Sequence, residues 1–327
     1  MPKTYKIEIS ARTIIFIVFF LLFLKLLWII RDLLFSLFIA FIVMSAVKPA
    51  VIRLEKFRIP RPLSTLIIFI GFIFGFAYLF YWFLPPLVYE TAIFFKSLPQ
   101  ILTRLAPNLL PYPNFSALTQ YLPNITNQFF SLVKGIFSNA IFLISTIFFS
   151  FYFVIEEDFI KKILVRFFEE EKTQSVVSIF NKIEERLRAW FWGELVLMMV
   201  VGLMTYVGLT LIGVRHAAFL AVVAGVLEVV PNLGPTISTI PAVLVASSQS
   251  YFLGLSTLAL YFIVQQLENN LIVPMVMRKA VGLNPIVTLI ALIIGGKIGG
   301  VLGVILAIPM TLFIESILIE IIKNRAK

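Results

Sequence analysis

The stretch FLGLSTLALYFIVQQLENNLIVP, residues 252–274, decides the class of this chain. It begins as an apolar run of membrane-spanning character. It then places a group of polar residues within six positions, without leaving the apolar segment: Gln265, Gln266, Glu268, Asn269 and Asn270. A carboxylate at that depth costs about 2–3 kcal/mol or more against membrane insertion. Polar residues inside a span face a bundle interior, a cavity or a transport path, so this stretch predicts a functional membrane helix rather than an anchor.

The composition around this stretch indicates a polytopic, all-α membrane protein. Hydrophobic residues make up 60% of the 327 residues, charged residues make up only 13%, and the mean hydropathy is +1.02. Soluble domains carry about 25% charged residues. Several apolar runs exceed the roughly 18 residues that allow a helix to cross lipid, so we expect about six to eight spans. The candidate full spans are 13–30, 33–47, 63–84, 137–155, 194–212 and 252–273.

The residue types that most often bind metals or act as nucleophiles in enzymes are scarce in this chain. It has no cysteine and a single histidine, His216. Thiolate zinc sites are therefore excluded, and His-rich metal sites and Ser-His-Asp triads nearly so. No Walker pattern is present. We predict no catalytic residues, no metal site and no cofactor. The net charge of +10 is better explained by basic loops between spans than by nucleic-acid binding.

The basic residues also predict the orientation of the chain. The loop 48–62 carries several of them: Lys48, Arg53, Lys56, Arg58 and Arg61. Because Lys and Arg concentrate in cytoplasmic loops, this loop is predicted to be cytoplasmic. The N-terminus, two crossings earlier, is then cytoplasmic as well. By the same crossing parity the basic C-terminus also lies inside.

Changes in composition divide the chain into five regions. The predicted regions are 1–84, the first three membrane helices; 85–136, a Pro-rich extracytoplasmic segment of short amphipathic helices; 137–155, the fourth membrane helix; 156–192, a charged amphipathic cytoplasmic helix; and 193–327, a transport core. In the charged helix an apolar stripe, Ile179, Ile183, Leu187 and Trp190, recurs at helical spacing. The favoured interpretation of this helix is a solvated element lying on the surface; the alternative is a regulatory docking site.

Two broken helical hairpins are predicted in the transport core, near 217–249 and 285–313. In the first, PNLGP at 231–235 separates two apolar runs that are each too short to cross lipid comfortably. A broken tip needs polar partners for its backbone, so it must be buried in protein or line water. Two opposed broken elements are typical of secondary transporters. The predicted break residues are Pro231, Gly234, Pro235, Pro274, Pro285, Gly295, Gly296 and Pro309.

Two carboxylates are the leading candidates for function. Glu228, three residues before Pro231, either exchanges a proton or a cation or sits in a hydrated loop. Glu268 shares a helical face with Gln265 and Asn269, a face that could hold a polar solute or a dehydrated cation, or could clamp helices together. The candidate pathway residues are Glu228, Asn232, Gln265, Glu268, Asn269 and Asn270.

Two further charged residues have open roles. Lys297, between two glycine pairs, either snorkels to the membrane surface or serves as a counter-ion to Glu228 or Glu268. Glu194 follows the aromatic run 190–192, and we expect it at the membrane interface rather than within the membrane.

Four sequence blocks together carry a family resemblance. They are GVLEVVPNLGP at 225–235, QLENN at 266–270, VGLNP at 281–285, and the glycines from Gly295 to Gly303 that lead into AIP at 307–309. In order and spacing they resemble the autoinducer-2 exporter family of PerM-like permeases over about residues 190–312. Residues 1–189 match that family only in the layout of their helices. Glu194 stands where a glutamine is common in the family.

The resemblance implies a multi-pass transporter of the bacterial cytoplasmic (inner) membrane. It implies a homo-oligomer in the lipid bilayer, a pentamer by analogy with the family. The implied partner is a small polar solute, such as autoinducer-2, that is exported; the alternative is sodium(lithium)/proton antiport through the same carboxylates. A hypothesis of another class is a non-transporting membrane scaffold whose 85–136 and 156–192 segments recruit partners.

Overall fold

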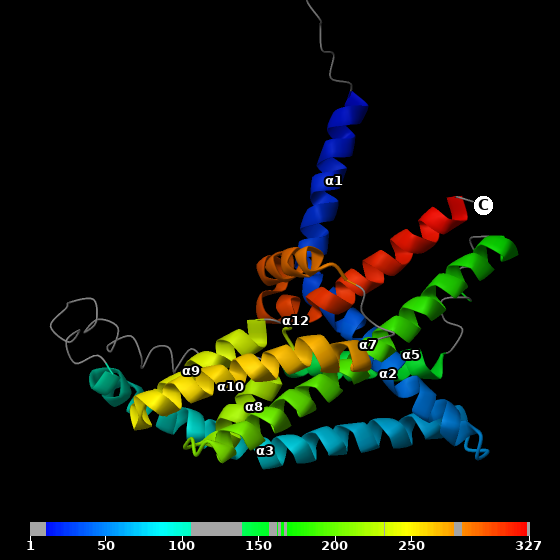
Figure 1. The fold of residues 1–327 in the computed structure, drawn as a ribbon. Coiled ribbons are helices and arrows are strands. Elements are labelled where there is room, and N and C mark those ends of the chain that lie inside the picture. The colour runs from blue at the N-terminus through cyan, green and yellow to red at the C-terminus, as the bar shows by residue number, and fades with distance from the viewer. Residues whose placement is uncertain are drawn as a thin grey trace, which may run out of the picture.

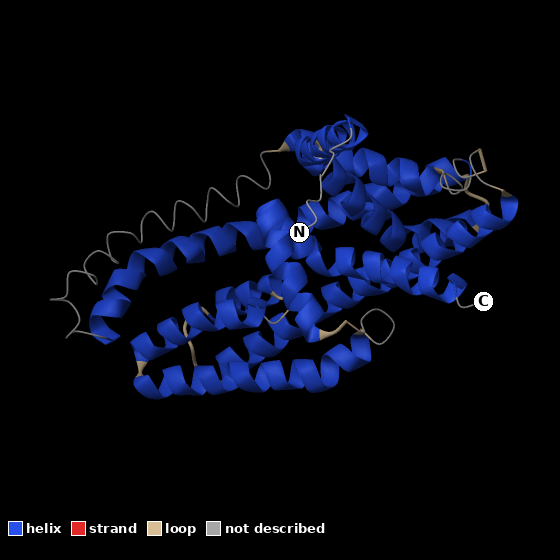
Figure 2. Cartoon of the chain, turned by 90° about the horizontal axis from the view of Figure 1, so that it is seen from above, coloured by secondary structure: helices blue, strands red, loops and turns tan. Residues whose placement is uncertain are grey.

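The chain is described by a computed structural model that covers residues 11–105, 139–156, 162, 165–166, 169–231, 233–277 and 283–325. Within these ranges it forms helices and no strands, which confirms the all-α class (Figures 1 and 2). The elements are α1 (Ala11–Ile29), α2 (Arg31–Glu55), α3 (Arg61–Leu105), α5 (Ala140–Ile155), α7 (Glu170–Leu211), α8 (Ala217–Leu227), α9 (Leu233–Gln249), α10 (Tyr251–Leu267), the π-helical turn η2 (Glu268–Ile272), α11 (Val273–Val276) and α12 (Pro285–Arg325).

Several of the described helices have the length and apolarity of membrane spans. Four qualify on both counts: Arg12–Ile29, Arg31–Glu55, Thr173–Leu211 and Pro285–Glu320. Shorter apolar helices cover Arg61–Gly75, Ile141–Ile155 and Ala217–Leu227. The consecutive elements α10, η2 and α11 add a run of helical turns over 251–276. These elements fit the polytopic membrane protein that the composition predicts.

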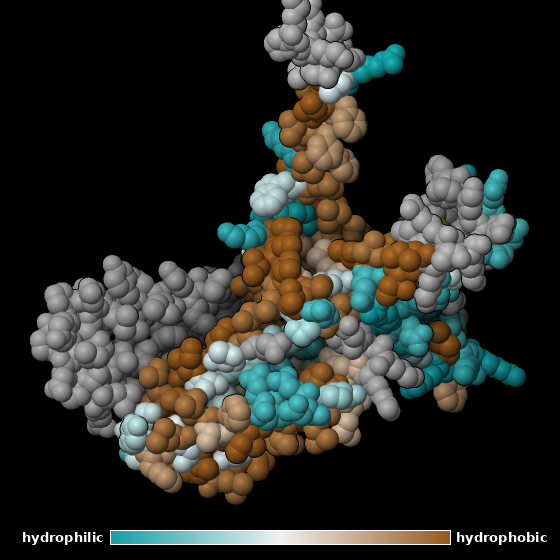
Figure 3. All heavy atoms as spheres, turned by 45° about the horizontal axis from the view of Figure 1, so that its top comes forward, coloured by the Kyte–Doolittle hydropathy of each residue, from teal (hydrophilic) through white to brown (hydrophobic). Residues whose placement is uncertain are grey.

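Helix α1 stands apart from the rest of the molecule, and helix α3 is longer than the sequence predicts. α1 projects from the rest of the molecule, and its side chains from Arg12 to Leu26 are all exposed (Figures 1 and 3). α3 runs through Pro85 and Pro86 to Leu105, so the third helix extends well past residue 84. The part of 85–136 that the structure describes therefore continues α3 and does not form separate short helices. Its placement outside the membrane stays a prediction.

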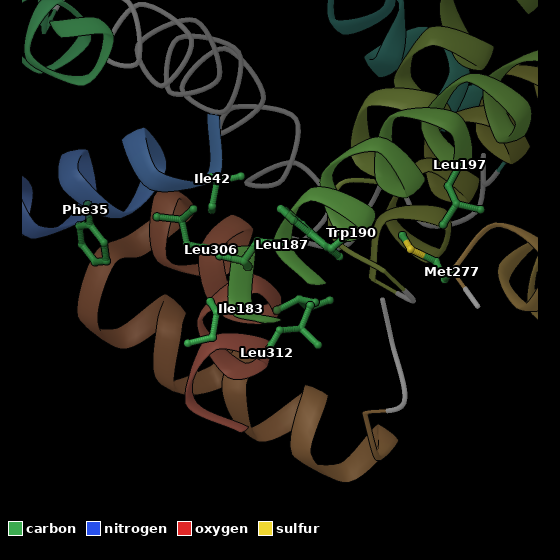
Figure 4. Packing of buried hydrophobic residues seen from close by; sticks show 10 residues of the cluster. Phe35, Ile42, Ile183, Leu187, Trp190, Leu197, Met277, Leu306 and Leu312 are labelled. Atoms are coloured by element: carbon green, nitrogen blue, oxygen red, sulfur yellow. The ribbon is translucent and has the colours of Figure 1, made fainter. Parts of the chain in front are cut away.

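The charged half of α7 is docked on protein, which corrects the expectation of a solvated surface helix. The helix begins at Glu170 and runs without a break into the apolar span. Its stripe residues Ile183 and Leu187 are buried in a cluster with Leu312 of α12 and Phe35 of α2 (Figure 4). The predicted apolar stripe is thus real, but it packs against neighbouring helices.

Ion pairs hold the polar side of the same half of α7. Glu184 accepts from Lys48 of α2 at 2.8 Å. Toward α12, Arg186 pairs with Glu315 at 2.6 Å and Lys182 with Glu320 at 2.8 Å. Pairs with partly exposed side chains contribute little individually, so the buried stripe carries most of the stability and the ion pairs fix the register.

The first predicted hairpin is present. α8 ends at Leu227 and α9 begins at Leu233, and the two helices pack against each other. A Cβ at Gly234 would collide with the carbonyl oxygen of Leu227, so the tight turn requires glycine there. Pro231 lies in the turn, while Pro235 lies in the first turn of α9, where its missing N–H removes no helical hydrogen bond.

The second hairpin is formed by α12 itself. Gly300 has φ 57° and ψ −135°, a conformation that breaks the helix and that side-chain-bearing residues rarely adopt. The two arms approach closely where Gly295 and Gly303 face each other's backbone carbonyls. The break therefore falls at Gly300; Gly295 and Gly296 lie within the first arm, and Pro309 lies within the second. Pro285 begins the helix rather than interrupting it.

Two leucines of α7 provide a test of this packing. Leu187 is fully buried and Leu203 is 63% exposed. We predict that Leu187→Ala lowers the stability of the detergent-purified protein by about 2–5 kcal/mol, because truncating a core leucine leaves a cavity. Leu203→Ala should change stability by less than about 1 kcal/mol, since its side chain contacts lipid or detergent. Thermal unfolding measures both; equal losses would contradict the docked arrangement.

Candidate functional site

Three glutamates from three helical segments meet in the seam between α7, α8 and α10. Glu194 of α7, Glu228 at the end of α8 and Glu268 at the start of η2 expose only 4%, 0% and 2% of their surface. The carboxyl groups of Glu228 and Glu268 lie within hydrogen-bonding reach of each other. Glu194 is close enough for its charge to act on both. The structure thus brings together the two predicted carboxylates and adds a third.

The close approach of α7 and α8 positions Glu228. Gly225 of α8 lies against Gly202 of α7, and a Cβ at Gly225 would come within 2.6 Å of the carbonyl oxygen of Met198. Small residues at such crossings let two membrane helices approach with their backbones nearly in contact. Glu228 follows Gly225 by three residues, so it lies on the same face of α8 and is carried into the seam.

A π-helical turn positions Glu268. The N–H of Val273 donates to the carbonyl of Glu268, five residues earlier. Pro274 provides the physical cause: it has no N–H to donate, and its ring would clash with the carbonyl of Asn270 in a regular α-helix. The widened turn relieves that clash. Single π turns of this kind are frequent at functional sites.

No base compensates these carboxyl groups among the described residues. No described N–H donates to either oxygen of Glu228, and one oxygen each of Glu194 and Glu268 is buried without a partner. Lys297, the candidate counter-ion, is exposed on the α12 hairpin and forms no ion pair with Glu228 or Glu268. Two carboxylates cannot donate to each other, so Glu228 and Glu268 can hydrogen-bond only when one of them holds a proton.

The three carboxyl groups do not make a metal site. Within the described ranges, no three His, Cys, Asp or Glu side chains converge as the ligands of a metal ion would. The arrangement is instead a close pair with a third acid nearby. A close pair of acids in a buried site is suited to holding and releasing a proton, because the two carboxyls cannot both ionise at low cost.

Three buried hydroxyl groups extend the polar seam. The oxygens of Thr205, Thr257 and Tyr261 make no hydrogen bond in the described part of the chain. Several other helical hydroxyls, such as those of Thr146 and Thr311, donate to the carbonyl four residues earlier, although those of Thr65 and Thr173 are also buried without a partner among the described residues. A buried hydroxyl without a partner is costly, so these three groups indicate a place for water or a polar ligand.

Within α7, and within α10 and η2, these groups lie on one face of the helix. Thr257, Tyr261 and Glu268 recur at spacings of four and seven, which places them on one face of α10 and η2. Leu260 lies against Gly208 and Met277 against Gly193, so α10 runs antiparallel to α7. We call this set the polar column; its members are Glu194, Thr205, Glu228, Thr257, Tyr261 and Glu268. At 1.5 Å per residue, the stretch of α7 from Glu194 to Thr205 is about 17 Å long, a little over half the thickness of a bilayer core.

Two of the amide side chains predicted for the pathway do not point into the buried site. Asn269 and Asn270 are exposed, and the amide of Asn270 donates to the carbonyl of Gln266 at 2.9 Å. Gln265 is half-buried, so Glu268 is the only fully buried polar residue of the predicted face. Asn232 lies outside the described residues. The structure therefore does not bring the two exposed asparagines to the carboxyl pair.

Sequence reasoning missed Glu194. It was expected at the interface because it follows three aromatic residues, yet its side chain is buried beside Glu268. The candidate span 194–212 already begins at Glu194, but no signal in the sequence shows that Glu268, more than 70 positions later, lies close to it.

Comparison with known proteins fits this architecture. The family model described as AI-2E family transporter matches residues 14–323. The chain belongs to this family. The candidate transport protein YueF of Bacillus subtilis is 28% identical over 316 residues, which cover 90% of this chain and 85% of YueF. YrrI of the same organism is 24% identical over 311 residues, which cover 90% of this chain and 87% of YrrI. The candidate permease PerM of Escherichia coli is 29% identical over 143 residues, which cover 43% of this chain and 40% of PerM.

Membership assigns the general role of the chain. A family of transporters and permeases, together with several long apolar helices, makes this protein a multi-pass membrane transporter. The family resemblance in the sequence is confirmed over nearly the whole length, beyond the 190–312 region where the motifs are dense. The buried carboxyl pair lies in two of those motifs.

The glycine contact that sets the depth of Glu228 can be tested with a matched pair. Gly225→Ala should lower the stability by about 1–3 kcal/mol, because its new methyl group meets the backbone of α7. Gly202→Ala should be neutral or slightly stabilising, since its Cβ meets only ordinary contacts at 3.4 Å and alanine favours a helix. Thermal unfolding in detergent compares them; a reversed order would mean that α7 and α8 are packed differently.

Proposed function

We propose that this protein is a proton-coupled secondary transporter that exports a small polar solute, of the autoinducer-2 kind, across the cytoplasmic membrane. The observation that carries the proposal is the Glu228–Glu268 pair, buried between helices with no basic partner among the described residues. Intramembrane acids of this kind mark ion pathways and proton relays. A scaffold would gain nothing from keeping them.

The pair supplies a simple coupling step. When one carboxyl holds a proton, Glu228 and Glu268 bond to each other, the pair carries a single negative charge and the seam is closed. Loss of that proton leaves two buried negative charges, which repel and favour a separated arrangement open to water or solute. The hydroxyls of the polar column, with oxygens that have no described hydrogen-bond partner, support water or solute on one side of the pair.

Sodium(lithium)/proton antiport is the second candidate. It is favoured by the acceptor-only character of the carboxyls, which suits a cation at least as well as a neutral solute. Proteoliposomes loaded with a pH-sensitive dye separate the two candidates. Proton movement driven by a sodium or lithium gradient alone would establish antiport; a dye signal that requires the organic solute and ignores both cations would remove it.

We also propose that the chain works as a homo-oligomer, with both termini in the cytoplasm. α1 has no described neighbour over most of its length, and Gln266, Asn269 and Asn270 are exposed on an otherwise apolar helix. Exposed amides are costly against lipid, so a second copy or a water-filled space would stabilise them. Mass measurement of the detergent-solubilised particle tests the state; a monomer that transports at the full rate would contradict it.

The carboxyl pair is tested by Glu268→Gln. The amide keeps the shape but cannot exchange a proton, so we predict loss of autoinducer-2 flux in proteoliposomes by at least tenfold, with normal insertion and assembly. The control is Glu185→Gln, an exposed acid on the charged half of α7, which should transport like the wild type. Wild-type flux from Glu268→Gln would remove the pair from the mechanism.

The hydroxyl part of the column has its own test. Thr257→Val replaces a buried, unpartnered hydroxyl with a methyl group of the same size. We predict a slower proton flux with unchanged or higher thermal stability, since an unsatisfied buried group is removed. In Thr311→Val the lost hydroxyl is one that bonds to its own helix, and flux should not change. Equal fluxes in all three proteins would show that the column carries no water.

A further inference from the structure

A groove lies between α2 and α7, away from the polar column. Its volume is about 590 Å³. The walls are small or apolar residues from both helices, and two arginines stand at its edge. The lining residues are Ala46, Pro49, Ala50, Arg53, Arg188, Ala189 and Trp192. No candidate function described above uses this groove.

The two arginines are available for a ligand. Neither Arg53 nor Arg188 forms an ion pair or a side-chain hydrogen bond with a described residue, although Arg188 is half-buried. Nearby bases on the same two helices are engaged: Lys48 holds Glu184 and Arg186 holds Glu315. Glu184 and Glu315 are thereby already paired, and the lining of the groove itself contains two arginines and no carboxylate. Paired guanidinium groups of this kind recognise phosphate well.

The groove lies at the boundary between charged and apolar sequence. Arg53 is in the last turn of α2, after its apolar stretch, and Arg188 is in the charged half of α7, just before its apolar stretch. Trp192 is 50% exposed, and its indole N–H donates to the carbonyl of Ala46 at 3.2 Å, which fixes the ring at the groove. Tryptophan rings of this kind sit at the headgroup level of a bilayer.

We propose that this groove binds the phosphate headgroup of an anionic phospholipid in the leaflet that contacts the basic loop 48–62. The arginines would hold the phosphate, and the small apolar walls would accept the glycerol and the first part of an acyl chain. A free anion would need only the charges, whereas the apolar walls and the interfacial tryptophan match an amphiphile. Basic pockets between membrane helices hold acidic lipids in the same way.

Native mass spectrometry of the full-length, detergent-purified protein tests this proposal. The probes are phosphatidylglycerol and phosphatidylcholine with identical acyl chains, and inorganic phosphate. Wild type should bind phosphatidylglycerol more tightly than phosphatidylcholine. The double variant Arg53→Gln, Arg188→Gln should bind phosphatidylglycerol about thirtyfold more weakly, since each arginine near a membrane surface contributes roughly fivefold.

A matched control removes the same amount of charge from the loop 48–62 beside the groove. Lys56→Gln with Arg58→Gln alters two exposed bases outside the groove and should leave the affinity for phosphatidylglycerol near that of the wild type. Size-exclusion profiles and circular dichroism confirm folding of both double variants. Equal losses in the two variants would overturn the site in favour of general surface attraction. Displacement of the lipid by equimolar inorganic phosphate would overturn the lipid assignment in favour of a small anion.

Discussion

The architecture depends on hiding acidic side chains from lipid, and no residue that the structure describes gives them a basic partner. An isolated carboxylate in an apolar medium is too costly to persist, so the helices that carry Glu194, Glu228 and Glu268 must face one another. The glycine contact between α7 and α8 and the widened turn of η2 both serve that end. Backbone irregularity and buried acid therefore occur together for one physical reason.

Much of the fold follows from the composition and from the positions of helix-breaking proline and glycine residues. Apolar run length predicts the helical membrane class, and PNLGP at 231–235 predicts the first hairpin, because a proline cannot continue a hydrogen-bonded helix. The acidic residues in motifs 225–235 and 266–270 predict two members of the buried pair. These features are local, so one sequence carries enough information to find them.

Features that depend on partner helices could not be predicted in this way. Leu187 and Leu203 lie on one helix and are equally apolar, yet one is in the core and the other faces outward, because lipid and protein interior favour the same residue types. The stripe of α7 looked like one face of a surface helix because its partners on α2 and α12 are distant in the sequence. Asn269 was assigned to the face of Glu268 on α-helical spacing, whereas η2 is a π turn, in which that spacing no longer holds.

The unbroken length of α7 has a mechanical consequence. Its 42 residues join the ion-paired half, clamped between α2 and α12, to the half that carries Glu194. A continuous helix transmits displacement along its axis, whereas a hinge would absorb it. Any tilt of the docked end therefore also moves Glu194, which lies a helix turn or more beyond the ion pairs along α7. In this protein the docked half of α7 and the half that carries Glu194 therefore move together as one rigid body.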